Sequence, residues 1–138
     1  LFVAGFIGSP EMNFVECTLV KEEERLCLDA KEFKISLPAR ILPKLRNHVG
    51  EQVIMGIRPE DIYESESVNG TLRENAIKMT MDLIEPIGPY LLLHLRCGQV
   101  SLVATVKDTN AKTGQEVIME MNLNKMHLFD EKTTKAIM

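Results

Sequence analysis

Aromatic residues are scarce in this chain, whose 138 residues include no Trp, two Tyr and five Phe. Long apolar runs are also missing, because none approaches the ~20 residues that cross a bilayer as a helix. Basic residues are outnumbered by acidic ones, 16 to 20, and a net charge of −4 disfavours non-specific binding to nucleic acid or to an anionic membrane. We therefore expect one soluble, intracellular domain, with 45% hydrophobic residues to form its core.

Cysteine is limited to three widely spaced residues with no CxxC pair, which predicts neither a disulfide framework nor a zinc site. Cys17 and Cys97 alternate with apolar neighbours and are predicted to lie in the core, whereas Cys27 is predicted to face solvent. The sequence contains no G-x-x-x-x-G-K-[ST] string and no nucleophile elbow, and its three histidines lack a partner that would mark a triad. We therefore predict no catalytic residue, cofactor site or metal site in this segment, and no enzyme activity of its own.

Alternation of apolar and polar residues dominates the chain and predicts half-buried β-strands. In residues 77–84, for example, Ile77, Met79, Met81 and Leu83 are predicted to share the buried face. Eight short strands are expected, at residues 14–20, 25–29, 33–37, 52–57, 77–84, 91–97, 100–106 and 117–123. The one helix candidate is short and covers residues 39–48. This pattern predicts an all-β barrel or sandwich.

Glycine and proline mark several strand ends. The strings are GIRPE at residues 56–60 and EPIGP at 85–89. A further string without either residue, HLFD at 127–130, is expected to end the final strand. Arg58 is expected to pair with Glu85 inside the fold, because a half-buried carboxylate needs a partner. The polar segment 62–76 contains Asn-Gly and has no sustained period, which predicts an exposed loop.

Four strings carry a family resemblance by their order and spacing: FVAGFIGSPEMNF at residues 2–14, GIRPE at 56–60, EPIG at 85–88 and HLFD at 127–130. They resemble the C-terminal regulatory region of the ATP-binding subunits of ABC importers for sugars, of the maltose and multiple-sugar type. The resemblance implies an OB-like β-barrel, called a TOBE domain, over residues 14–130, with a tail over 131–138. Residues 1–13 would be the junction with a nucleotide-binding domain, against which Phe2, Phe6, Ile7 and Phe14 would pack.

The same resemblance implies a function. The segment would be the regulatory and dimerisation domain of an ABC-type ATPase that energises carbohydrate import, with ATP and Mg²⁺ bound in the missing domain. Its partners would be a second copy, its own nucleotide-binding domain, the membrane subunits and, in some members, a regulatory protein, with no nucleic acid among them. The assembly would lie in the cytoplasm at the inner face of the cell membrane. Candidates for the dimer or partner surface are Gly50, Gly56, Arg58, Glu60 and Glu85.

Two other functions stay open, the first of them suggested by the same resemblance. A TOBE-type module could sense a small ligand, either a sugar or an oxyanion, at a dimer seam. A stand-alone OB module for single-stranded oligonucleotides is less favoured, because such a module needs a basic groove with stacking aromatic side chains.

Overall fold

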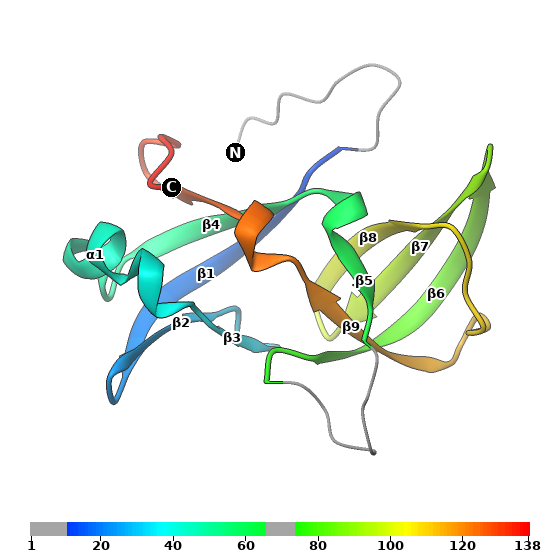
Figure 1. The fold of residues 1–138 in the computed structure, drawn as a ribbon, viewed down its shortest axis with the longest axis horizontal. Helices are drawn as coiled ribbons and strands as arrows, with labels where there is room; N and C mark the ends of the chain where they lie inside the picture. The colour runs from blue at the N-terminus through cyan, green and yellow to red at the C-terminus, as the bar shows by residue number, and fades with distance from the viewer. Residues whose placement is uncertain (1–10, 66–73) are drawn as a thin grey trace.

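A computed structural model describes residues 11–65 and 74–138, which form two five-stranded antiparallel sheets (Figure 1). Sheet A has the strand order β10-β4-β1-β2-β3, and sheet B has the order β5-β9-β6-β7-β8. The strands of sheet A are β1 (Asn13–Glu22), β2 (Arg25–Asp29), β3 (Lys34–Ser36), β4 (Gln52–Ile57) and β10 (His127–Asp130). Those of sheet B are β5 (Ile62–Glu64), β6 (Ile77–Ile87), β7 (Tyr90–Cys97), β8 (Val100–Val106) and β9 (Glu116–Met121).

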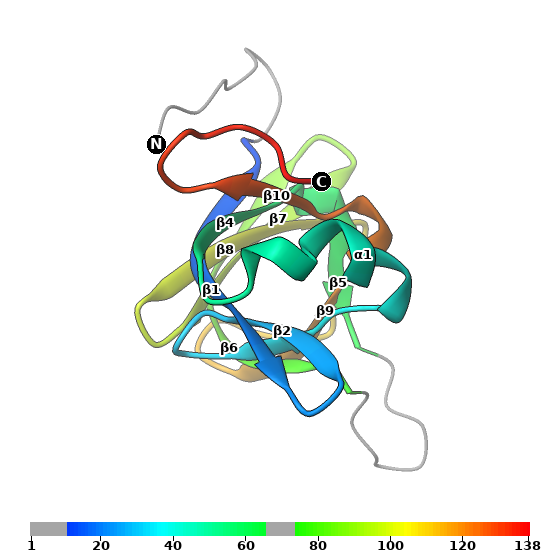
Figure 2. The same ribbon diagram turned by 90° about the vertical axis from the view of Figure 1, so that its left-hand side faces the viewer.

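A short helical segment connects β3 to β4 and confirms the predicted helix. It is built from η1 (Ala39–Ile41), α1 (Leu42–Leu45) and η2 (Arg46–His48), and its buried side chains are Ile41 and Leu45. Figure 2, which looks along the long axis, shows the strands curled around a common centre with α1 across the near end. Single 3₁₀ turns, η3 (Pro59–Asp61) and η4 (Leu123–Lys125), precede β5 and β10.

The two sheets are copies of one pattern that exchange their last strand. Sheet A contains the order β4-β1-β2-β3, and sheet B contains the corresponding order β9-β6-β7-β8. The strand that follows β4 is β5, yet it pairs with β9, and the strand that follows β9 is β10, yet it pairs with β4. Residues 53–55 of β4 and 117–119 of β9 even share the letters VIM. Neither half completes its sheet without the other, so we expect the described chain to unfold as one unit.

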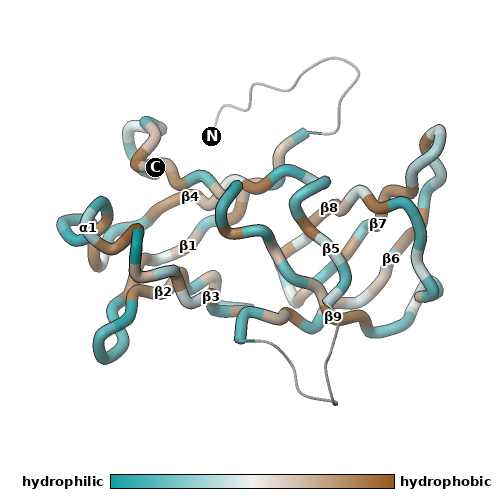
Figure 3. The backbone as a smooth tube through the Cα atoms, viewed as in Figure 1, coloured by the Kyte–Doolittle hydropathy of each residue, from teal (hydrophilic) through white to brown (hydrophobic). Residues whose placement is uncertain are grey.

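The strand predictions are confirmed, because alternation does place one face of most strands in a core. Figure 3 shows hydrophobic colour along the strands and hydrophilic colour in most connections. A hairpin joins β7 to β8, and a similar hairpin joins β6 to β7. Gly98 and Gly88 open these two-residue loops with φ of 58° and 56°, a conformation that glycine adopts at little cost. Fully buried side chains of both sheets, such as Leu28 and Leu93, belong to one cluster.

The predicted loop at residues 62–76 is wrong at its start, where the structure has β5. Ile62 is only 1% exposed and pairs with Met121, and Glu64 pairs with Met119. A strand of three residues in a polar stretch is too short to show a recognisable alternation, and its partner strand lies far along the chain. The rest of this prediction falls largely on residues 66–73, which lie outside the described residues.

Leu83 also departs from its predicted buried position. The register between β6 and β7 shifts between Met81, which pairs with Leu95, and Leu83, which pairs with His94. The bulge inserts Asp82 as an extra residue, so the strand changes face at this point. Met81 is fully buried, whereas Leu83 is 50% exposed. Strict alternation therefore predicts the wrong face for every residue of β6 beyond the bulge.

The cysteines follow the prediction only in part. Cys17 is buried, as predicted, while Cys97 is only partly buried and lies at the end of β7. Cys27 was predicted to face solvent, yet it is 5% exposed. The reason is that Glu74 and Asn75 reach across the outer face of β2 and β3, where they bond to Arg25 and Ser36. That cover comes from a distant segment, which local alternation does not reveal.

Burial of Cys17 predicts a loss of stability at alkaline pH. Burial, together with Asp29, raises the pKa of the Cys17 thiol from 9.0 to about 12. Above pH 9.0 the unfolded chain releases this proton while the folded chain keeps it, so the free energy of unfolding falls by up to about 1.4 kcal/mol per pH unit. Urea unfolding of the wild type and of Cys17→Val across this range measures the difference. The wild type should lose stability more steeply, and parallel pH profiles would contradict the prediction.

Candidate functional site

The five residues proposed for a dimer or partner surface lie in different parts of the fold. Gly50 is exposed in the turn before β4, with φ of 89°, and Gly56 is buried within β4. Arg58 and Glu60 follow at the start of η3, and both are exposed. Glu85 is exposed near the far end of β6 in sheet B. The turn between α1 and β4 and the far end of β6 lie at opposite ends of the long axis (Figure 1).

The predicted Arg58–Glu85 pair is wrong. The Glu85 carboxylate lies 2.9 Å from Nε2 of His94 on the neighbouring strand, and half of its side-chain surface is exposed. Arg58 lies instead near Asp61, whose pKa is raised by burial and by Glu60 and is lowered again in part by Lys125 and Arg58. Both members of the predicted pair are exposed, so neither needs the other to offset a buried charge.

Gly56 makes room for an aromatic contact between β1 and β10. Phe14 lies directly across from it on β1, and the rings of Phe14 and Phe129 have centroids 6.1 Å apart at an angle of 57°. A Cβ at residue 56 would lie 3.0 Å from Cε2 of Phe129 and 2.7 Å from the sulfur of Met12. Phe14, predicted as a junction residue, therefore packs within sheet A. The other junction residues, Phe2, Phe6 and Ile7, lie outside the described residues.

Two asparagine side chains join the sheets at equivalent places. Asn13 begins β1, and its amide accepts from the Val103 N–H at 2.8 Å and donates to the Val103 carbonyl at 2.9 Å on β8. Asn75, just before β6, makes the same two bonds with Ser36 on β3, both at 2.9 Å. An amide side chain offers the donor and acceptor of a peptide group, so each asparagine extends one sheet onto the other. We call these two contacts the Asn clamps.

The Asn clamps were not predicted from the sequence, although it holds a signal for them. Each asparagine stands two residues before the first buried residue of a strand, Val15 or Ile77. The repeat of the two halves is needed to see that these positions correspond. A carboxylate would accept the N–H bond but not donate the other, so the amide is the group that fits both partners.

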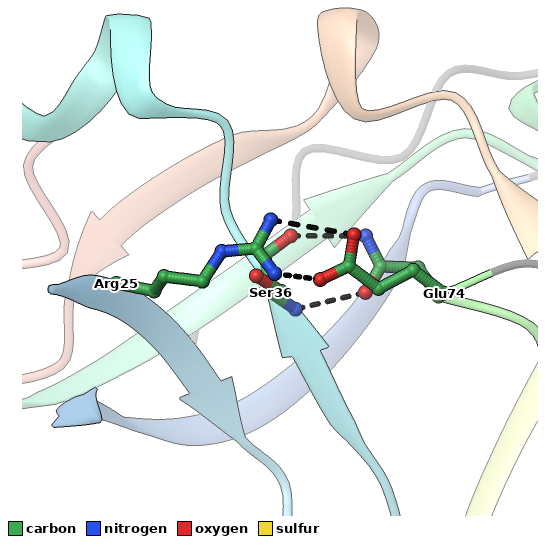
Figure 4. Close-up of polar contacts among 4 residues, drawn as sticks. Arg25, Ser36 and Glu74 are labelled. Carbon is green, nitrogen blue, oxygen red and sulfur yellow. Dashed lines mark hydrogen bonds and ion pairs between the residues drawn. The ribbon is translucent and has the colours of Figure 1, made fainter. Parts of the chain in front are cut away.

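A hollow beside the Asn75 clamp is lined by paired charges. Arg25 forms an ion pair with Glu74 (Figure 4), and elsewhere in the lining Lys34 forms one with Glu22. Both pairs are largely exposed, so each contributes little to stability. Because each of these two cations already has a carboxylate partner, this hollow does not favour the binding of an oxyanion.

The outer face of the β6–β7 hairpin carries exposed apolar side chains. Beyond the bulge, Leu83 and Ile87 lie on β6 with exposed fractions of 50% and 48%, and Tyr90 on β7 has 44%. Ile87 pairs directly with Tyr90. Glu85, His94, Asp82 and Arg96 lie among them as two cross-strand pairs, with distances of 2.9 Å and 3.1 Å. We call this surface, formed by Asp82, Leu83, Glu85, Ile87, Tyr90, His94 and Arg96, the hairpin face.

The structure gives no sign of a metal centre in residues 11–65 and 74–138, where no three His, Cys, Asp or Glu side chains are grouped to hold an ion. No helix of the described residues is long and apolar enough to cross a membrane.

Comparison with known families decides the classification. A family model described as the TOBE domain matches residues 55–129, which is more than half of the chain. The chain belongs to the TOBE domain family. A second model, described as the MalK OB fold domain, matches residues 8–62 of this TOBE protein. The predicted OB-like β-barrel is therefore confirmed. The TOBE model matches mainly sheet B, and the MalK OB fold model matches mainly sheet A.

Relatives of this TOBE protein include ATP-binding proteins of transporters. The "Trehalose/maltose import ATP-binding protein MalK" of Thermococcus litoralis is 36% identical over 141 residues, covering 99% of this chain and 37% of the relative. The "Multiple sugar-binding transport ATP-binding protein MsmK" of Streptococcus mutans is 32% identical over 137 residues, covering 99% and 36%. The chain thus spans little more than a third of the length of these relatives.

A solved structure has the same fold. The cytoplasmic molybdate-binding protein ModG, determined with molybdate bound, matches with a TM-score of 0.64 and 12% sequence identity. The match covers 90% of this TOBE protein and 98% of ModG. At this identity the likeness shows the fold and says nothing of the ligand.

Proposed function

We propose that this chain is the C-terminal regulatory and dimerisation domain of an ATP-binding subunit that energises carbohydrate import. The observation that carries the proposal is the match to the trehalose/maltose import protein over 99% of the chain but only 37% of that relative. The remaining length of such a subunit would hold ATP and Mg²⁺ and perform the hydrolysis. In this division of labour the chain supplies binding surfaces and no catalytic group.

Dimerisation by a second domain has a clear physical use in such a subunit. Two ATPase domains that close around nucleotide must separate again, and a separate contact keeps one near the other while they are open. Linked domains meet at a high effective concentration, so each closure becomes an intramolecular step. A twofold contact uses the same patch on both copies, so the chain needs one self-complementary surface.

The other partners follow from the same role. The ATP-binding domain of the same subunit would be one partner, and the membrane subunits would be reached through that domain. The assembly would lie on the cytoplasmic side of the membrane, where a regulatory protein could also bind the barrel. Oxyanion sensing is not favoured by the paired charges of the hollow beside Asn75.

Measurement of the mass in solution tests the proposed dimerisation. Sedimentation equilibrium of the 138-residue chain from micromolar to millimolar concentration should show a reversible approach to twice the monomer mass. A monomer throughout this range would contradict the dimerisation role. Association beyond the dimer would contradict a closed twofold contact, because a patch that pairs with itself is used up in the dimer.

A further inference from the structure

We propose that the hairpin face is the surface through which two copies of this chain pair. The inference rests on the proposed function, since it assigns a place to the dimer contact. It differs from the five residues singled out in the sequence, of which only Glu85 belongs to this face.

The first observation is the apolar content of the hairpin face. Leu83, Ile87 and Tyr90 are each between 44% and 50% exposed, and together they are three of the five large exposed hydrophobic side chains of the described residues. The register of β6 and β7 places all three on one side of the hairpin. Exposed apolar side chains gathered on one surface, with polar groups among them, are typical of a contact with another protein.

The bulge in β6 creates this surface. If β6 paired regularly through Asp82, with no bulge, Leu83 would continue the buried row of Met79 and Met81, and Ile87 would follow it. With the bulge, both side chains turn to the outer side of the strand. A bulge that directs apolar side chains away from the core costs burial, so it indicates a function for the surface that it forms.

The second observation is the arrangement of charge on the hairpin face. The acidic groups, Asp82 and Glu85, lie on β6, and the basic groups, His94 and Arg96, lie opposite on β7. A twofold axis parallel to the strands sets β6 of one copy against β7 of the other. Each acidic row then faces a basic row, and at the tip Ile87 of each copy faces Tyr90 of the other. The face is therefore complementary to itself in charge, which favours a second copy over a partner of one charge sign.

The edge of the same hairpin argues for contact through its face. Beyond Met81, β6 pairs with β7 alone, because its pairing with β9 covers residues 77–80. Pro86 lies in this free edge and has no N–H to donate to an added strand. Proline in an edge strand protects it against pairing with another edge. Two copies would therefore pack hairpin face against hairpin face.

Reversal of each charged row tests the proposal. The first variant, Asp82→Lys with Glu85→Lys, makes the hairpin face basic throughout, and the second, His94→Glu with Arg96→Glu, makes it acidic throughout. Each variant alone should pair at least about tenfold more weakly than the wild type, because like charges then meet across the twofold axis. An equimolar mixture should restore a dimer that contains one copy of each variant. The four side chains are 35–50% exposed, so the folded chain should accept both variants.

The control is Lys44→Glu with Arg46→Glu, which reverses two exposed charges on α1 and η2 at the other end of the molecule. It should dimerise like the wild type. Circular dichroism melts establish that each variant is folded, and sedimentation with one fluorescently labelled variant identifies the mixed dimer. If the wild type dimerises and both variants dimerise as strongly as it does, the hairpin face is not the dimer contact, and the proposed function stands. A monomeric wild type would overturn both.

Discussion

Replacing Asn75 with aspartate is expected to lower the free energy of unfolding by about 2 kcal/mol. The Asn75 amide donates to the Ser36 carbonyl and accepts from the Ser36 N–H, each at 2.9 Å. Aspartate keeps the acceptor but turns a carboxylate oxygen toward the Ser36 carbonyl, which loses its donor. Since this clamp joins β3 to the segment before β6, the loss weakens the contact between the sheets. Urea unfolding with an unchanged m-value measures the change.

Asn122→Asp is the matched control for this prediction. The Asn122 side chain only accepts a hydrogen bond, from the Asn124 N–H at 3.1 Å, and a carboxylate does this equally well. The control should therefore stay within about 0.5 kcal/mol of the wild type. A further variant, Asn75→Ala, removes the acceptor of the Ser36 N–H. This amide proton should then exchange with solvent faster than it does in the wild type. Equal stability of Asn75→Asp and Asn122→Asp would refute the clamp.

The clamp of Asn13 can be compared with that of Asn75 to test whether the two act alike. Its amide makes the corresponding pair of bonds with Val103, and its Nδ2 also donates to the Ile57 carbonyl at 3.2 Å. The clamps share no bonding partner, so their contributions to stability should add. The repeat of strand order in the two sheets thus extends to the polar contacts that hold the sheets together.

Local patterns in the sequence predicted most of the fold. Alternation identified β1 because one face of this strand lies in the core and the other is in part polar. It failed for β5, which is short and pairs with a strand more than fifty residues away. It also failed beyond Asp82, because one inserted residue reverses the faces of a strand. The first error comes from pairing with a distant strand, and the second comes from the register between β6 and its neighbour β7. The period of a single strand contains neither.

The candidate site was harder to predict than the fold. The GIRPE string contributed to a correct family resemblance, yet it does not reveal that Gly56 serves an aromatic contact with Phe129, which is 73 positions further along. The clamp of Asn75 likewise depends on a strand 39 residues earlier. Glu85 was expected to need a buried partner, but the bulge in β6 brings it to an exposed face. Recognition of the family places the chain in its class, and only the tertiary pairing shows what each of these residues contacts.

Gly56→Val is expected to lower the free energy of unfolding by about 2–3 kcal/mol. Valine favours β-strands, so backbone preference alone would make this substitution harmless or stabilising. The added carbons would instead collide with the Phe129 ring, which lies 3.0 Å from the position of a Cβ, and with the Phe14 ring at 3.4 Å. Met12 is closer still at 2.7 Å, but the end of its flexible side chain can move away. Urea unfolding of the variant measures the loss.

The collision with Phe129 can be separated from other effects by a second substitution. Ser101→Val adds the same side chain at an exposed position of β8 and should change stability by no more than about 0.5 kcal/mol. Phe129→Leu removes the ring, so Gly56→Val should cost clearly less in that background than in the wild type, and the double-mutant cycle gives the coupling between the two residues. If Gly56→Val costs the same with and without the Phe129 ring, glycine is required at this position for a reason other than the aromatic contact between β1 and β10.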